Sequence, residues 1–234
     1  MLQGACQRAP VLVQPADASL APFWHTRALT LMLLAVALSG TALDSQATLL
    51  APAPSLAGGY WSLLLVNVGL AFYAARLGLP RSLFWQLVGR AEARGLTRDL
   101  AWAGALLVLI LASESALQLW FGMPESVFAR ALLPILPRDK VGWLLLSVVI
   151  GTSEELVYRG YLRQQLEALS NSPWLAVLLQ ALLFGIAHGA QGPWAVARFA
   201  VYGLALGYVA LRRRSIVPCV LCHVALDAYA GLAR

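Results

Sequence analysis

Long apolar runs, separated by short segments that contain proline or arginine, constrain the fold of this chain more than any other feature. Of its 234 residues, 60% are hydrophobic and 12% are charged. A soluble domain has about 25% charged residues, so this composition is typical of a protein that crosses a membrane several times. We expect an all-α, polytopic membrane helical bundle with about seven transmembrane helices, forming a single integral membrane domain over residues 1–234.

The apolar runs give the approximate bounds of these helices. Residues 1–25 are mixed in character and predict a short N-terminal tail before an uncleaved first helix. Residues 80–98 alternate apolar and arginine positions, which favours a helix in the headgroup plane, although an ordinary basic loop fits the same pattern. Residues 122–140 contain three prolines and are too broken for a span. The expected spans cover residues 28–43, 59–79, 99–121, 141–162, 173–188, 193–211 and 216–232.

The net charge of +6 comes from arginines that flank the apolar runs, which is typical of orientation signals and does not suggest a nucleic-acid partner. The positive-inside rule places residues 76–98 and 212–214 in the cytoplasm. Arg130, Arg138 and Lys140 then fall on the opposite side, which conflicts with the rule. The abundance of Ala, Leu and Arg, with a single lysine, favours a bacterial inner (cytoplasmic) membrane.

Two adjacent carboxylates and an arginine follow the apolar run 141–150. Ionisable groups at the centre of a membrane helix cost about 2.5–3.5 kcal/mol each on insertion scales. Glu155 and Arg159 are four residues apart, so they share a helix face and are expected to pair. Glu154 lies about 100° further round the helix and lacks this partner. If these residues lay at a helix end that reaches headgroup water, the positions of Arg159 and Glu155 would be explained, but that of Glu154 less well. We therefore interpret Glu154 as a functional carboxylate.

Two later spans also carry ionisable residues. The fifth contains His188, four residues after Phe184, and the seventh has His223 and Asp227 four residues apart on one face. A single membrane histidine is more often a helix–helix hydrogen bond than a catalyst, but three helices with such groups imply a polar interior cavity. Zinc bound by Glu154, His188 and His223 is one possible use of these groups. The residue types of a water-activating site are also present, in Glu154, His188, His223 and Asp227.

The segment Cys219-x-x-Cys222-His223 matches the C-x-x-C-H pattern of covalent haem attachment. Haem attachment requires a segment that is exposed on the oxidising side of the membrane. This motif instead lies inside an apolar helix that follows the cytoplasmic arginines 212–214. We therefore do not expect haem, and we interpret the two cysteines as small buried apolar residues.

Three motifs on separate spans resemble those of the CPBP family. This family comprises the CAAX-processing and bacteriocin-processing intramembrane proteases, also called Abi proteins, and is related to the Ras-converting CAAX endopeptidase. The resemblance covers residues 141–232, which are expected to form the catalytic core helices, whereas residues 1–140 match only in being membrane helices. The motifs are Glu154-Glu155-x-x-x-Arg159, Phe184-x-x-x-His188 and His223-x-x-x-Asp227.

The resemblance implies an intramembrane endopeptidase that hydrolyses a peptide bond near the membrane-embedded end of a protein or peptide substrate. It implies that Glu154 and His188 activate the attacking water, and that His223 stabilises the oxyanion with Asp227. Asp227 would either hold His223 in one tautomer or be protonated itself. We favour this metal-free glutamic mechanism, with zinc as the alternative. The positions that match structural or substrate-orienting residues are Glu155, Arg159 and Phe184.

Two other classes of function fit the same residues. A proton-coupled transporter also buries Glu, His and Asp, but it predicts inverted repeats between the two halves of the chain, and none is evident. A non-catalytic membrane scaffold or immunity factor would need no bond-breaking chemistry. The expected partners are the lipid bilayer and a membrane-associated protein or peptide, whose identity and prenylation the sequence does not specify.

Overall fold

The structure, a computed structural model, describes residues 21–35, 56–88, 93–122 and 127–233, and every regular element within these ranges is helical. The predicted all-α fold is confirmed. The first described element is a helix over residues 23–35. The α-helices that follow are α2 (Leu56–Tyr73), α3 (Arg81–Val88), α4 (Ala93–Phe121), α5 (Val127–Leu132), α6 (Pro137–Glu155), α7 (Arg163–Ser170), α8 (Pro173–Ala187), α9 (Pro193–Arg213) and α10 (Val217–Leu232).

Two π-helical segments and one 3-10 turn complete these elements. The π-helix η1 (Ala74–Gly78) extends α2, and the π-helix η2 (Leu156–Leu162) joins α6 to α7 without a break. The 3-10 turn η3 (Gly189–Gln191) connects α8 to α9. A π-turn widens the helix locally and is often found at functional sites, and η2 begins directly after the two adjacent glutamates.

Prolines and one polar cap determine where the C-terminal helices begin. Pro137, Pro173 and Pro193 occupy the first turns of α6, α8 and α9, where the missing N–H breaks no helical hydrogen bond. The Ser172 hydroxyl accepts a hydrogen bond from the Leu175 N–H at 3.3 Å and caps α8. The predicted starts of the fifth and sixth spans at Pro173 and Pro193 are therefore confirmed.

By length and composition, four described helical segments can cross a membrane: Tyr60–Gly78, Gly95–Phe121, Pro137–Ser170 and Pro193–Arg213. The expected fifth and seventh spans form as α8 and α10, which have 15 and 16 residues and are shorter than the roughly 20 that a span needs. The helix over 23–35 begins before the expected position, within the predicted tail, and residues 36–43 of the expected first span lie outside the described residues. Seven spans were expected, and the described residues supply four long helices and two shorter apolar ones.

Within the helix expected over 80–98, the structure has α3 up to Val88 and α4 from Ala93, and residues 89–92 lie outside the described residues. Two other predicted boundaries are wrong. The third span starts before Asp99 because the Asp99 carboxylate does not end the helix but pairs with Arg213 at 2.8 Å. The fourth helix continues beyond residue 162 to Ser170, since α7 packs on α8 and its Arg163 pairs with Glu167 at 2.8 Å.

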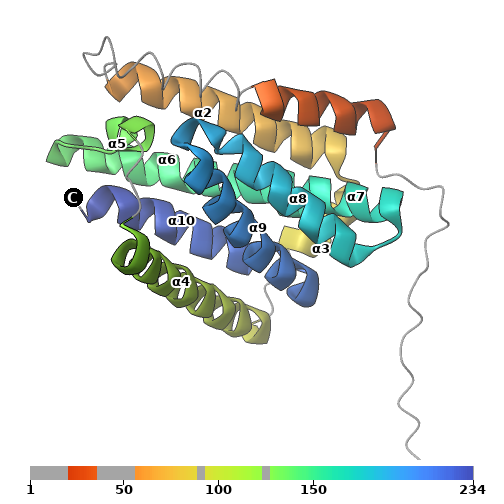
Figure 1. Cartoon of the computed structure of the whole chain (residues 1–234). Helices are drawn as coiled ribbons and strands as arrows, with labels where there is room; N and C mark the ends of the chain where they lie inside the picture. The colour runs from red at the N-terminus through yellow and green to blue at the C-terminus, as the bar shows by residue number, and fades with distance from the viewer. Residues whose placement is uncertain (1–20, 36–55, 89–92, 123–126, 234) are drawn as a thin grey trace, which may run out of the picture.

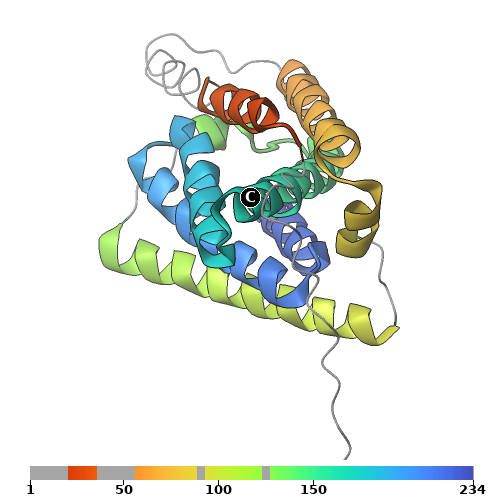
Figure 2. The same ribbon diagram turned by 90° about the vertical axis from the view of Figure 1, so that its right-hand side faces the viewer.

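The helices of the three motifs pack together in the centre of the bundle. α6 lies between α2 and α10, and α4 packs on the far side of α10 (Figure 1). α8 and α9 pack closely on each other and cross in front of this layer (Figure 1). In the view turned by 90°, α4 runs along one side of the bundle and the helix over 23–35 lies on the opposite side (Figure 2). The motif-bearing helices are thus flanked on both sides.

Two glycines allow close helix contacts next to the motifs. A Cβ atom at Gly151 would lie 2.9 Å from Val224 Cγ2, so α6 and α10 approach each other more closely here than a larger residue permits. A Cβ atom at Gly185 would lie 2.8 Å from Ala200 Cβ, which brings α8 equally close to α9. The first contact places the third motif beside the first, and the second contact holds α8, which carries the second motif, against α9.

Candidate active site

A fully buried ion pair lies at the junction of α6 and η2. Arg159 Nη1 donates a hydrogen bond to Glu155 Oε1 at 2.7 Å, and both side chains are 0% exposed. The predicted pairing of these two residues is confirmed. Removing one partner of such a pair leaves an uncompensated buried charge, so each side chain fixes the position of the other.

The imidazole of His223 connects this pair to α10. His223 Nδ1 lies 2.8 Å from Glu155 Oε1, and because an ionised carboxylate only accepts, Nδ1 carries the proton of this hydrogen bond. The same oxygen therefore accepts from both Arg159 and His223. Glu155 thereby fixes the ring orientation of His223 and the proton on Nδ1, a role that the sequence had suggested for Asp227.

Two further carboxylates face the other nitrogen of His223. Glu154 Oε2 and Asp227 Oδ2 each lie 3.8 Å from His223 Nε2. Glu154 Oε2 is buried and makes no hydrogen bond within the described part of the chain. The spacing of His223 and Asp227 did predict that they share a face, and Glu154 is, as predicted, separate from the Glu155–Arg159 pair. Three acidic side chains from two helices therefore surround one imidazole.

His188 lies at the C-terminal end of α8. Its Nδ1 is 2.8 Å from the Phe184 carbonyl oxygen, which can only accept, so Nδ1 carries a proton and Nε2 is the acceptor nitrogen of the neutral ring. The ring stacks on Phe199 with centroids 3.8 Å apart. Within the described residues His188 makes no hydrogen bond to Glu154, so the structure does not join these two sequence-predicted residues directly.

The Phe184 ring lies between the two histidines. Its centroid is 4.7 Å from that of His188 and 6.0 Å from that of His223. The Arg159 guanidinium carbon lies 4.3 Å from the centre of the Phe184 ring, in a cation–π contact that stabilises the buried charge. Phe184, which the sequence had placed among the supporting residues, thus contacts all three motifs.

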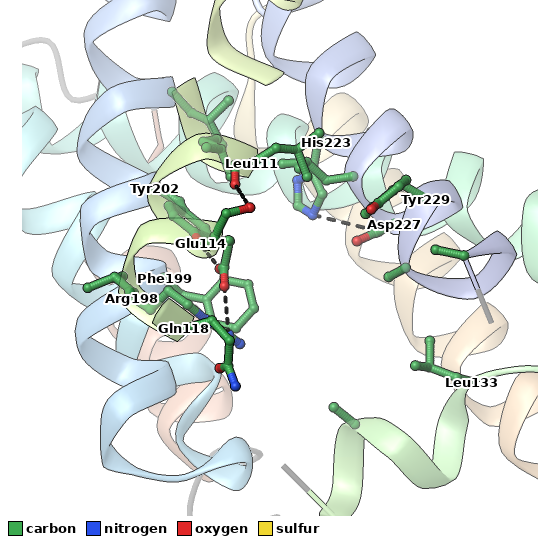
Figure 3. Close-up of a pocket in the computed structure, with 18 of the residues that line it drawn as sticks. Leu111, Glu114, Gln118, Leu133, Arg198, Phe199, Tyr202, His223, Asp227 and Tyr229 are labelled. Carbon is green, nitrogen blue, oxygen red and sulfur yellow. Dashed lines mark hydrogen bonds and ion pairs between the residues drawn. The ribbon is translucent and has the colours of Figure 1, made fainter. Parts of the chain in front are cut away.

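A cavity of about 700 Å³ opens beside these residues. His223 and Asp227 of α10 lie on one wall, and residues of α4 and α9 form the opposite wall (Figure 3). Ligand sites commonly have volumes of about 300–1,000 Å³, so this cavity can hold a segment of a small peptide. Phe184, His223 and Asp227 line this cavity, whereas Glu154, Glu155 and His188 do not. A polar cavity shared by the ionisable groups of all three motif-bearing helices stays a prediction.

Sequence reasoning missed several polar contacts at the site. The Ser153 hydroxyl, next to Glu154, donates to Asn67 Oδ1 of α2 at 2.5 Å. Glu114, an acid inside the apolar run of the third span, contacts Arg198 and Tyr202 of α9 on the cavity wall. An isolated acid in an apolar run is the one signal that pointed to this second set of residues.

The possible metal ligands and the two cysteines of the C-x-x-C-H segment are all among the described residues. No group of three His, Cys, Asp or Glu side chains in the described ranges is positioned to hold a metal ion. Cys219 and Cys222 are buried free thiols, and the Cys219 thiol donates to the Leu206 carbonyl at 3.2 Å. Zinc binding by Glu154, His188 and His223 stays a prediction, as does the expectation that the protein lacks haem.

The fold and this site together define a helical integral membrane protein with a cluster of buried and half-buried acids and histidines beside a cavity. Residues 137–229 match the family model described as type II CAAX prenyl endopeptidase Rce1-like. The matched segment contains all three motifs, and the predicted resemblance to CAAX-type proteases is confirmed. The match supports a CAAX-type intramembrane endopeptidase that acts on membrane-associated substrates. No curated protein and no solved structure matches the chain.

Proposed function

We propose that this protein hydrolyses a peptide bond near the membrane-embedded end of a protein or peptide substrate, with a water molecule that Glu154 activates. One observation carries the proposal: Glu154 and Asp227 both face Nε2 of a histidine whose other nitrogen is held by the buried Glu155. This set lies inside an apolar bundle, and its His223 and Asp227 side chains line a cavity that can receive a peptide.

Glu154 is the general base of the proposed reaction. Its Oε2 atom is buried and makes no hydrogen bond in the described structure, so it is available to accept a proton from water. The 3.8 Å separation from His223 Nε2 leaves the base close to the group that would meet the developing oxyanion. The hydroxide attacks the substrate carbonyl, and the proton passes from Glu154 to the leaving amine.

His223 stabilises the oxyanion in this proposal. To donate a hydrogen bond from Nε2, the imidazole must carry protons on both nitrogens. The Glu155 carboxylate, which also pairs with Arg159, accepts the hydrogen bond from Nδ1 at 2.8 Å and so favours this charged form. Asp227, 3.8 Å from Nε2, adds a second carboxylate that favours the same charged form.

His188 assists Glu154 as a second acceptor for the water proton. Its hydrogen bond to the Phe184 carbonyl leaves Nε2 as the acceptor nitrogen. Catalytic hydrogen bonds are often long before substrate binds, so the lack of a direct His188–Glu154 contact is compatible with this role. Zinc held by Glu154, His188 and His223 is the alternative, in which the metal would polarise the carbonyl and the water.

The substrate is a membrane-associated protein or peptide, in keeping with the description of the matched family. A prenylated CAAX tail, a peptide precursor and the membrane anchor of a surface protein are the candidates. The whole chain is proposed to act as one integral domain in a bacterial inner membrane, with the arginines at 76–98 and 212–214 in the cytoplasm.

The direct test is cleavage of a farnesylated CAAX peptide by protein reconstituted in lipid vesicles. We expect Glu154→Gln to lower the rate about 10²- to 10⁴-fold, which is the usual contribution of a general base. Glu167→Gln is the matched control, because Glu167 lies on the same continuous helix but pairs with Arg163 away from the site. Equal rates for wild type and Glu154→Gln would rule out the proposed base.

Zinc content decides between the two mechanisms. The glutamic mechanism predicts full activity in protein that contains much less than one zinc per chain. Stoichiometric zinc in active protein, lost together with activity in His223→Ala, would replace it by the metal-dependent mechanism.

A further inference from the structure

A second polar cluster lies on the cavity wall opposite His223 and outside the three motifs. It consists of Glu114 from α4 and of Arg198 and Tyr202 from α9 (Figure 3). Arg198 Nη1 lies 3.3 Å from Glu114 Oε2, and the Tyr202 hydroxyl donates to Glu114 Oε1. The glutamate is thus held between two α9 side chains, and it fixes the position of the arginine at the cavity.

Most of the donors of Arg198 are left unused. A guanidinium group has five N–H donors, and in the described structure Arg198 makes one hydrogen bond, to Glu114. Its Nε atom is buried without a hydrogen-bond partner, and the side chain as a whole is 29% exposed. A donor in this position is costly unless an acceptor reaches it, so the cluster is incomplete without another group.

The charges around the cavity indicate which chemical group of a ligand could accept hydrogen bonds from Arg198. On the wall formed by α4 and α9 the charged side chains are Arg198 and Glu114, and Arg130 of α5 lines another part of the cavity. The other wall has Asp227, next to His223. A peptide with its scissile carbonyl at His223 and an anionic group at Arg198 would match both walls. Glu114 disfavours a doubly charged phosphate, whereas a guanidinium forms paired hydrogen bonds with a planar carboxylate.

We propose that Arg198, positioned by Glu114 and Tyr202, binds a carboxylate of the substrate peptide, and so sets how far the bond that is cut lies from an anionic group. The carboxylate is either the C-terminal carboxylate or an Asp or Glu side chain. This inference rests on the proposed function, because it takes the wall at His223 as the place where the peptide bond is cut.

The test measures binding and cleavage separately. Fluorescent farnesylated CAAX peptides are made with a free C-terminus, with a C-terminal amide, and with an amide plus a terminal Asp residue. Their affinities are measured with the Glu154→Gln protein in lipid nanodiscs, and their cleavage with the otherwise wild-type protein. Each measurement is repeated with Arg198→Gln, with Arg198→Lys, and with Arg212→Gln as a control that removes an exposed arginine from the same helix outside the cavity.

The proposal expects the free-acid peptide or the Asp peptide to bind at least about tenfold more tightly than the plain amide, since hydrogen bonds to charged groups are worth this factor or more. The peptide that binds more tightly than the plain amide identifies whether the carboxylate comes from the C-terminus or from a side chain. Arg198→Gln should abolish the difference by raising KM with kcat nearly unchanged, Arg198→Lys should keep part of it, and Arg212→Gln should keep it all.

Equal affinity for all three peptides, or discrimination that survives in Arg198→Gln, would overturn the carboxylate site. Competition by phosphatidylglycerol alone, with no carboxylate effect, would overturn it in favour of a lipid phosphate. Failure of the proposed function looks different: the wild type would then cleave no peptide, while Arg198-dependent binding could still be measured. Cleavage of acid and amide peptides at equal rates would leave the protease standing and remove the carboxylate site.

Discussion

Two of the glutamate–arginine pairs in the described helices lie near the candidate site, and they differ in exposure and in geometry. Glu155 and Arg159 are 0% exposed and 2.7 Å apart on one helix, whereas Glu114 and Arg198 are 34% and 29% exposed and 3.3 Å apart on different helices. The first pair is closed off by His223 and Phe184, and the second borders the cavity. We infer that the buried pair holds the site in place and that the cavity pair meets the substrate.

Breaking the buried pair should have the largest effect. Arg159→Ala leaves the Glu155 carboxylate buried without its cation, which is expected to cost about 3–5 kcal/mol of unfolding free energy. Thermal unfolding in detergent checks this, with yield of folded protein as a second readout. If Arg159→Ala unfolded at the wild-type temperature, the pair would not hold the site as described.

Separating α6 from α10 should have the next largest effect. Gly151→Ala places a methyl group about 2.9 Å from Val224 Cγ2, and overpacking of this kind costs about 1–3 kcal/mol. It should also lower activity by moving His223 away from Glu155. Gly104→Ala is the matched control, because a Cβ there meets nothing within 4 Å and should stabilise α4 slightly. Equal behaviour of the two variants would contradict the close contact.

The hydrogen bond between α2 and the first motif should contribute less. Asn67→Ala removes the acceptor of the Ser153 hydroxyl, which still bonds to the Ile150 carbonyl at 3.0 Å. We expect a loss of about 0.5–1.5 kcal/mol in unfolding free energy, with a lower kcat because Glu154 is next to Ser153. An unchanged kcat in a destabilised variant would restrict Asn67 to a purely structural role.

The cavity pair should contribute least to stability. Glu114→Gln removes the charge from a partly exposed pair, and such pairs are worth about 0–1 kcal/mol. Its unfolding temperature should stay close to that of the wild type, in contrast with Arg159→Ala. A destabilisation as large as that of Arg159→Ala would remove the distinction between the two pairs.

The difference between the pairs also explains what the sequence could predict. Glu155–Arg159 and His223–Asp227 are each four residues apart on one helix, so helix geometry alone brought them together. The contact between Glu155 and His223 links two helices and depends on how α6 packs on α10. Glu114 could be recognised as a costly acid in a span, but its partners on α9 could not be identified.

The helix boundaries also could be predicted from the sequence only where a local signal sets them. Prolines marked the starts of α8 and α9 correctly, since a proline in the first turn is a local signal. The start of α4 before Asp99 depends on Arg213, a residue far along the chain. The π-helix η2 lies in a segment whose sequence reads as an ordinary helix, and its seven residues are all buried by other helices. Contacts between residues far apart in the sequence therefore set the start of α4 and surround η2, and local sequence patterns could not predict either.

The central claim is that Glu154 is the base of a membrane protease, and mapping of protein termini in the host's membranes tests it most directly. Wild type is compared with Glu154→Gln and with the Glu167→Gln control at matched amounts of folded protein. The account predicts new termini that are present with wild type and the control and absent with Glu154→Gln, which would also identify the substrate and the cut site. Identical termini in all three samples, with the substrate expressed, would contradict it.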